Sequence, residues 1–368
     1  MKRFLELDFL RGFLLLMMIV NHSPSPLRRF TDQPLGFFST AEGFVFVSAL
    51  LAGMLFQRRS EKLGFAAAKS ATVTRAFKIY LAHLGTLVFA FLVGGIFLVQ
   101  LPGLRNLLNE YWKNPAAAAM ASLALLFQPP LMDILPMYIV FSFLTPLVFW
   151  TAQRQGWRLV FVVSAVCWLL SQFQIRDTLL APAKGFSFVD PGPFDLLSWQ
   201  FLWVGGLIFG KCVQQKQAVR MPVAGEIIFL VLGIVFLVWR WSCIYLNVDP
   251  SREYWFLSKW HLGPLRVLNF FVAAWTVSKV LPRLVRWERL IHPLTLVGQN
   301  MLPVFVFQLC LSLLLLGFLT PTGPGPRTTT FWVLLQIVAA LGYAWILDHW
   351  ARVKAEVRNG SGGVLPAH

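Results

Sequence analysis

Two ionisable residues, Arg11 and His22, lie eleven positions apart in the first apolar segment of the chain. Eleven residues make almost three helical turns, so on a helix both side chains lie on one face, about 16 Å apart along the axis. Asp8 shares this face, because it lies three residues before Arg11. Charged residues inside a membrane-spanning helix cost about 2.5 to 3.5 kcal/mol each on insertion scales and usually mark a substrate or proton pathway. We therefore predict catalytic roles for His22, Arg11 and Asp8.

The chemistry that these residue types support is acid–base catalysis. Near neutral pH a histidine can accept a proton from a hydroxyl nucleophile, and a fixed arginine can bind an anionic donor or polarise a carbonyl group. The alternative is purely structural. In that interpretation Asp8 and Arg11 form an ion pair at a helix end, and His22 lies at the membrane interface.

Five further polar residues, Glu42, Arg75, His83, Asp133 and Arg266, fall in or beside later apolar segments. We predict that Glu42, Arg75, His83 and Arg266 bind the substrate or the donor. Each has a structural alternative. Glu42 suits the N-terminus of a helix, Arg75 a positively charged cytoplasmic end, and Asp133 an N-cap position. His83 would be a hydrogen-bonded structural histidine, and Arg266 would extend along the helix toward the interface.

The elements that must position these residues are membrane helices. The chain has 57% apolar and only 13% charged residues, whereas soluble domains carry about 25% charged residues. Long apolar stretches predict an all-α, polytopic membrane protein with about ten transmembrane helices. We place them at 9–23, 41–57, 78–101, 134–151, 159–175, 194–211, 223–247, 262–281, 294–318 and 329–348. Residues 1–350 would form one transmembrane domain, and 351–368 a polar, disordered cytoplasmic tail.

The basic residues that give the net charge of +16 are distributed by loop, as in a membrane protein, and do not indicate nucleic-acid binding. With the N-terminus in the cytoplasm, twenty of the 32 Lys and Arg residues fall in inner segments and nine in outer segments, as the positive-inside rule predicts. Both termini are therefore expected in the cytoplasm. This count requires that the apolar segment 115–128, which is too short for a transmembrane helix, does not span.

Several classes of chemistry lack their motifs in this sequence. There is no HExxH, GxSxG, Walker-type or GxGxxG motif, and the four cysteines lie singly, without a metal-ligand spacing. We expect no metal site and no bound cofactor.

Seven stretches, spread over nearly the whole chain, resemble a known family. ELDFLRG (6–12) with His22 contains an arginine, ten residues and a histidine in the first helix. The others are EGFVFVS (42–48), RAFKIYLAH (75–83), DILPMY (133–138), SWQ (198–200), LGPLRVLN (262–269) and VGQNMLPVF (297–305). Together they resemble the membrane acyltransferase-3 superfamily, and within it the OpgC-type branch, which succinylates osmoregulated periplasmic glucans.

The resemblance implies an O-acyltransferase in the bacterial inner membrane. It would move a succinyl or acetyl group from cytosolic acyl-CoA to a periplasmic glycan or lipid-linked saccharide. The resemblance implies Arg11 and His22 as the central pair and, as supporting residues that bind substrate or donor or orient the pair, Asp8, Glu42, Arg75, His83, Asp133 and Arg266. Its expected partners are acyl-CoA, this glycan and membrane lipid, without nucleic acid. The main alternative is a transporter of a polar or anionic solute that uses the same buried His, Arg and Asp residues. A non-catalytic membrane scaffold is the third alternative.

Overall fold

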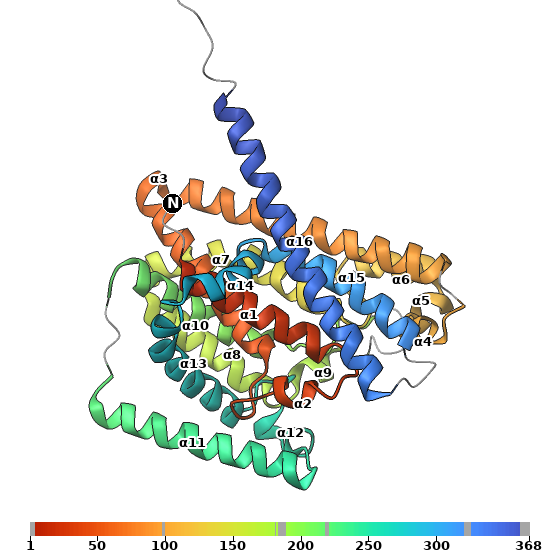
Figure 1. Cartoon of the computed structure of the whole chain (residues 1–368). Coiled ribbons are helices and arrows are strands. Elements are labelled where there is room, and N and C mark those ends of the chain that lie inside the picture. The colour runs from red at the N-terminus through yellow and green to blue at the C-terminus, as the bar shows by residue number, and fades with distance from the viewer. Residues whose placement is uncertain are drawn as a thin grey trace, which may run out of the picture.

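The computed structural model of the protein describes residues 4–97, 100–180, 182, 189–217, 221–319 and 325–360. These residues form helices and connecting segments without strands, and one isolated β-bridge joins Phe127 to Asp190. The helices pack into a bundle from which α16 (Pro326–Gly360) projects at its C-terminal end (Figure 1). The predicted all-helical class is therefore confirmed for the described residues.

The other helices fall into long bundle helices and short connecting ones. The long helices are α1 (Leu5–Asn21), α3 (Thr40–Val88), α7 (Ile134–Gln155), α8 (Trp157–Ser171), α10 (Leu196–Gln214), α11 (Val223–Leu246), α13 (Pro264–Leu284), α14 (Glu288–Gln299) and α15 (Met301–Leu319). The short helices are α2 (Arg28–Thr31), α4 (Pro102–Leu107), α5 (Asn109–Lys113), α6 (Pro115–Leu123), α9 (Ile175–Leu180) and α12 (Pro250–Glu253). A π-helical segment, Phe89–Phe97, extends α3, and a 3₁₀ turn, Trp255–Leu257, follows α12.

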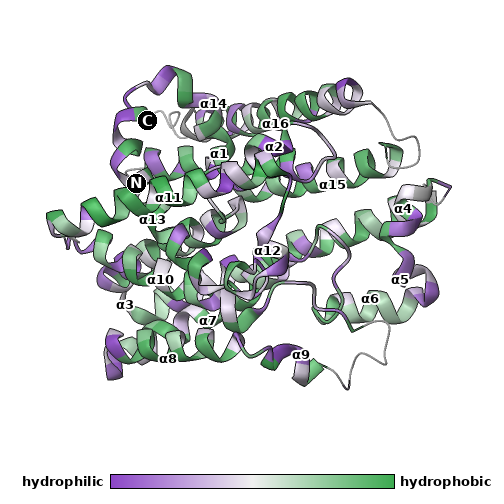
Figure 2. Cartoon of the chain, turned by 90° about the horizontal axis from the view of Figure 1, so that it is seen from below, coloured by the Kyte–Doolittle hydropathy of each residue, from purple (hydrophilic) through white to green (hydrophobic). Residues whose placement is uncertain are grey.

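Within the described residues, six helices are long and apolar enough to cross a membrane. They are Thr40–Ile96, Ile134–Gln155, Leu196–Gln214, Val223–Leu246, Met301–Leu319 and Pro326–Val357. Hydrophobic residues run along these helices, while hydrophilic residues gather in short ones such as α5 and α9 (Figure 2). This composition indicates a membrane protein.

The predicted count of about ten spans is not supported. The predicted spans 41–57 and 78–101 belong to one long run of helix. The helices found at 9–23 and 159–175 have only 17 and 15 residues, shorter than the roughly 20 residues that cross the hydrocarbon core. The helix found at 262–281, α13, carries the charged residues Arg266 and Lys279, and it is not among the six candidate spans. The cytoplasmic location of both termini stays a prediction.

Two further expectations concern short segments. The segment 115–128 forms only the nine-residue helix α6, about 14 Å long, as expected for a segment that does not span. The expectation of a disordered tail after residue 350 is wrong for 351–360, because α16 continues to Gly360. The remaining tail residues, 361–368, lie outside the described residues.

The long helix α3 is divided by Gly64, which has a φ of 83° and a ψ of 163°. A positive φ of this kind suits glycine, because it has no Cβ. No atom lies within 4 Å of the place where a Cβ would stand, so the backbone conformation alone accounts for the glycine. The chain changes direction here, and two halves of one helix can contribute side chains to one site.

Glycines allow α1 and α14 to touch along their backbones. A Cβ on Gly12 would stand 1.9 Å from the carbonyl oxygen of Leu294, and one on Gly298 would stand 1.8 Å from the carbonyl oxygen of Asp8. Such close approach between helices requires residues without side chains. The contact fixes the turn of α1 that carries Asp8 and Arg11.

We expect Gly298→Ala to force α14 away from α1. Overpacking of this kind costs about 1 to 3 kcal/mol of unfolding free energy, so the thermal unfolding temperature of the purified protein should fall. Gly342→Ala in α16 is the matched control, because nothing lies within 4 Å of its Cβ position. It should leave the unfolding temperature unchanged or slightly higher. Equal effects of the two substitutions would contradict this account of the α1–α14 contact.

Candidate active site

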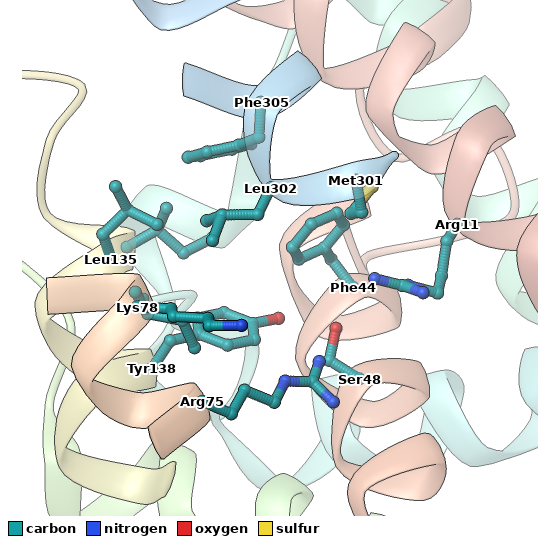
Figure 3. Close-up of a pocket in the computed structure, with 12 residues that line it drawn as sticks. Arg11, Phe44, Ser48, Arg75, Lys78, Leu135, Tyr138, Met301, Leu302 and Phe305 are labelled. Atoms are coloured by element: carbon teal, nitrogen blue, oxygen red, sulfur yellow. The ribbon is translucent and has the colours of Figure 1, made fainter. Parts of the chain in front are cut away.

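A cavity of about 130 Å³ lies where α1, α3, α7 and α15 meet. Its polar lining comes from Arg11 of α1, Ser48, Arg75 and Lys78 of α3, and Tyr138 of α7. Figure 3 shows the hydroxyl group of Ser48 between the guanidinium groups of Arg11 and Arg75, and the hydroxyl group of Tyr138 on the side of Lys78. Because Ser48 precedes Gly64 and Arg75 follows it, the division of α3 brings these residues together. We call this space the cationic cavity.

The charge in the cationic cavity is unbalanced. Among the described residues, its lining includes Arg11, Arg75 and Lys78 but no carboxylate. Asp8 compensates Arg11 in part, with an Nη1 to Oδ1 distance of 3.7 Å, as the three-residue spacing on α1 predicts. Arg11 Nε is buried and has no hydrogen-bond partner among the described residues. Buried cations of this kind favour an anionic or strongly dipolar ligand.

A second cavity, of about 50 Å³, adjoins the first and extends toward the Gly64 turn. Arg75, Ile79 and Tyr138 line both cavities, and Arg59 and Thr72 are among the other lining residues of the second. Three arginine side chains therefore line the two adjoining cavities, in the order Arg59, Arg75 and Arg11. This arrangement suits a ligand with several anionic groups.

Glu42 and Arg266 form a separate, fully buried ion pair, and both side chains are 0% exposed. The Arg266 Nε–H donates to Glu42 Oε1, and the backbone N–H of Ser39 donates to Glu42 Oε2 at 3.0 Å. Neither charged residue lines the cationic cavity. The pair joins the start of α3 to α13, which favours a structural role, while ligand binding by these residues stays a prediction.

His22 caps the C-terminal end of α1, at the opposite end from Asp8. Its Nδ1 is buried and has no hydrogen-bond partner among the described residues. His22 does not line the cationic cavity. The structure therefore brings Arg11 together with Arg75, and places His22 about three turns away along α1.

The segment that follows His22 is held in place from α11 and α13. Asn269 Oδ1 accepts from the backbone N–H of Phe37 at 2.5 Å, and Asn269 Nδ2 donates to the carbonyl of Leu35 at 3.3 Å. Arg240 of α11 donates to the carbonyl of Asp32 at 3.3 Å. The segment between His22 and α3 is thus fixed by contacts far apart in the sequence.

His83 is fully buried in the second half of α3. Neither ring nitrogen has a hydrogen-bond partner among the described residues. Because buried polar groups are nearly always paired, an unpaired imidazole indicates a position that a ligand or water completes. His83 does not line the cationic cavity, and its binding role stays a prediction.

Asp133 occupies the predicted N-cap position of α7. Burial raises the pKa of its carboxyl to about 6, and Lys259 opposes the shift. Burial also lowers the pKa of Lys259, which interacts electrostatically with Glu42, Arg266 and Asp133. These groups form a polar region next to α7, distinct from the cationic cavity.

The raised pKa of Asp133 makes stability depend on pH. Because the folded-state pKa of about 6 exceeds the unfolded value near 3.9, this carboxyl favours folding below about pH 4. That contribution is lost as the pH rises through 6. We therefore expect Asp133→Asn to flatten the change in unfolding temperature between pH 4 and pH 7. An unaltered pH profile in a folded variant would contradict the assignment.

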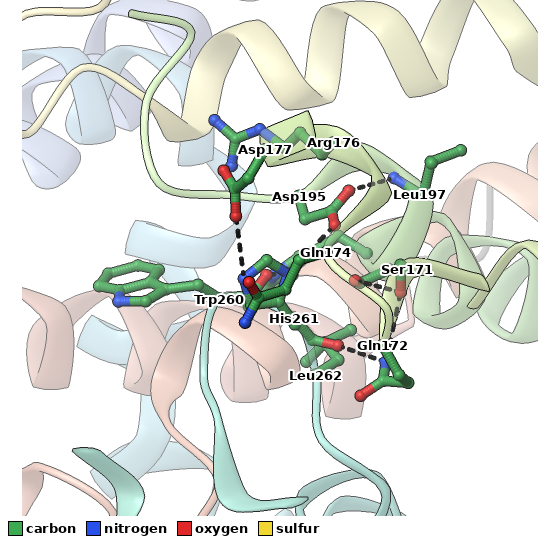
Figure 4. A network of polar contacts seen from close by, with 12 residues as sticks. Ser171, Gln172, Gln174, Arg176, Asp177, Asp195, Leu197, Trp260, His261 and Leu262 are labelled. Carbon is green, nitrogen blue, oxygen red and sulfur yellow. Dashed lines mark hydrogen bonds and ion pairs between the residues drawn. The ribbon is translucent and has the colours of Figure 1, made fainter. Parts of the chain in front are cut away.

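Another polar network links α9, α10 and the segment before α13 (Figure 4). His261 Nδ1 lies 3.2 Å from Asp195 Oδ2, and its Nε2 lies 3.7 Å from Asp177 Oδ2. Asp195 also accepts from the backbone N–H of Leu197 at 2.9 Å. Since a carboxylate lies beside each ring nitrogen, His261 joins α9 and α10 to the segment before α13.

The sequence interpretation did not assign Ser48 and Tyr138 to the site. Both are polar residues in otherwise apolar parts of the quoted stretches EGFVFVS and DILPMY, and that contrast was the available signal. The His261–Asp195 contact joins residues 66 positions apart, and no local pattern indicates it.

The comparison with known families places this geometry in context. A family model described as "OpgC protein" matches residues 3–352. No curated protein and no solved structure matches the chain. Membership in the wider acyltransferase-3 superfamily stays a prediction. A match over nearly the whole length shows the family, and the chain belongs to the OpgC protein family.

Proposed function

We propose that this protein is a membrane O-acyltransferase of the bacterial inner membrane, crossing it several times with both termini in the cytoplasm. The acyl group, succinyl or acetyl, comes from cytosolic acyl-CoA. The acceptor is a hydroxyl of a periplasmic glycan, with osmoregulated periplasmic glucan as the acceptor that OpgC family membership favours. The cationic cavity is the observation that carries the proposal, because acyl-CoA is an anionic donor.

The residues of the cavity suit the donor. Arg75 and Lys78 bind anionic groups of acyl-CoA, and Arg59 of the adjoining cavity adds a further cation along the same path. Arg11 holds a further anionic group of the donor. Asp8 orients Arg11 through their ion pair.

His22 acts on the acceptor. Its buried Nδ1, which has no hydrogen-bond partner among the described residues, takes the proton from the acceptor hydroxyl while the oxygen attacks the carbonyl carbon of the thioester. A carbon–oxygen bond forms, the carbon–sulfur bond breaks, and the proton passes to the departing thiolate to give free CoA. Because His22 and Arg11 lie about 16 Å apart along α1, the donor must extend from the cationic cavity toward His22.

Reconstituted wild-type protein provides the test. Proteoliposomes are supplied with isotopically labelled succinyl-CoA or acetyl-CoA on one side and with purified periplasmic glucan on the other. We expect label in the glucan only when protein, donor and acceptor are all present, and mass analysis should locate it as an ester. Label uptake without any acceptor modification would favour the transporter instead, and no transfer from either donor would overturn the proposal.

A further inference from the structure

Two polar side chains, His83 of α3 and Gln308 of α15, are 0% exposed and carry nitrogen atoms without a hydrogen-bond partner among the described residues. In His83 both ring nitrogens lack a partner, and in Gln308 it is Nε2. Gln308 Oε1 accepts from the hydroxyl of Ser312 at 3.3 Å, which fixes the orientation of the amide. Because buried polar groups are nearly always paired, both positions suit a ligand that supplies the missing partners.

His83 and Gln308 continue the two helix faces that line the cationic cavity. On α3, Ile79 lines the cavity, and His83 follows four residues later. On α15, Phe305 lines it, and Gln308 follows three residues later. Residues three or four apart share one face of a helix. Each unpaired side chain therefore lies one turn beyond a wall of the cavity.

On α15 this turn leads from the cavity toward His22. Gln336 of α16 donates from Nε2 to the carbonyl oxygen of Gln308 at 3.3 Å, and its Oε1 accepts from the hydroxyl of Ser23 at 3.4 Å. Ser23 directly follows His22 in the chain. One glutamine side chain thus connects Gln308 to the end of α1 that carries His22.

The second half of α3 runs beside α15 in the same direction. Ile79 and Phe305 line the cationic cavity together, and Leu87 and Leu313 belong to one hydrophobic cluster farther along the two helices. His83 therefore lies beyond the cavity on the same side as Gln308. Both unpaired groups lie between the cationic cavity and the end of α1 that carries His22.

We propose that His83 and Gln308 bind the pantetheine arm of the acyl-CoA donor. The inference rests on the proposed function, in which the cationic cavity holds the anionic groups of the donor and the thioester carbonyl lies beside His22. The pantetheine arm joins these two parts of the donor and contains two amide groups. Gln308 Nε2 donates to an amide carbonyl oxygen. A neutral imidazole has one donor and one acceptor nitrogen, so His83 pairs with a carbonyl oxygen and an N–H of the arm.

The experiment compares two probes, CoA and phosphoadenosine diphosphate, which is CoA without its pantetheine arm. Their affinities are measured for the purified wild-type protein and for His83→Phe and Gln308→Met. We expect each substitution to weaken CoA binding about 2- to 10-fold, the effect of one hydrogen bond between neutral groups. The affinity for phosphoadenosine diphosphate should stay at the wild-type value. Arg75→Gln should weaken the binding of both probes, because both carry the phosphates.

Gln200→Met is the matched control. The Gln200 amide is already paired, because Nε2 donates to the carbonyl of Ser164 at 2.8 Å and Oε1 accepts from the Ser164 hydroxyl at 2.7 Å. Its loss breaks a contact between α8 and α10 but should leave the affinity for CoA unchanged. Either of the variants at His83 and Gln308 provides the test if the other does not fold.

Three results would overturn the inference. The first is wild-type affinity for CoA in the folded variants, and the second is an equal weakening of both probes. The third is an equal loss of CoA affinity in the control at Gln200. If the wild type itself does not bind CoA, the proposed donor is wrong, and this inference falls with it.

Discussion

Replacing His22 with alanine is expected to lower the rate of acyl transfer by about 10²- to 10⁴-fold, the usual contribution of a general base. The physical reason is that the acceptor hydroxyl loses the group that takes its proton. Because the His22 Nδ1 makes no hydrogen bond to the described residues, removing the imidazole breaks no such contact. The loss should therefore appear in kcat, with the amount of folded protein in the membrane unchanged.

His349→Ala is the matched control for this measurement. His349 stacks on Trp345 near the C-terminal end of α16, with ring centroids 5.5 Å apart, and its loss should leave transfer at the wild-type rate. Both variants are compared by transfer of labelled acyl groups to glucan at saturating donor. A His22→Ala protein that is correctly inserted and transfers at the normal rate would disprove the catalytic role.

Breaking the buried pair between Glu42 and Arg266 is expected to have the largest effect on stability. Arg266→Met leaves the Glu42 carboxylate buried without its cation, and the removal of one partner of such a pair costs about 3 to 5 kcal/mol. The double variant Glu42→Leu with Arg266→Met should recover much of this loss, because it removes both charges. The measurement is the unfolding free energy in detergent, or the unfolding temperature where unfolding is irreversible.

An exposed ion pair provides the comparison. Lys279 contacts Glu226, and their side chains are 53% and 36% exposed. Exposed pairs contribute about 0 to 1 kcal/mol, so Lys279→Met should change stability far less than Arg266→Met. If the two substitutions were equally mild, or if the double variant were no more stable than Arg266→Met, burial of the Glu42–Arg266 pair would not be what stabilises the fold.

The local part of the fold could be predicted from the sequence. Long apolar stretches indicated an all-helical protein, and the three-residue spacing of Asp8 and Arg11 predicted their ion pair, which is found at 3.7 Å. Both inferences depend on residues that are neighbours along one helix, where geometry follows from spacing alone.

The long-range part could not be predicted, because no spacing rule connects distant helices. Glu42 and Arg266 lie 224 residues apart. The sequence offered only the local surroundings of each residue, and nothing in those surroundings connects the two. The convergence of Arg11 with Arg75 depends on the division of α3 at Gly64, while the sequence showed only two apolar stretches with a basic segment between them. The count of about ten spans that hydropathy predicted is not supported by the described helices, because hydropathy ignores where helices begin and end.

The division at Gly64 has a mechanical consequence. Ser48 lies on one arm of α3 and Arg75 on the other, so the angle at one hinge sets the gap between the walls of the cationic cavity. A rotation at this hinge would widen or narrow the entrance. Because both arms contribute residues to the core, such as Phe56 and Ile79, the rotation would also shift core contacts.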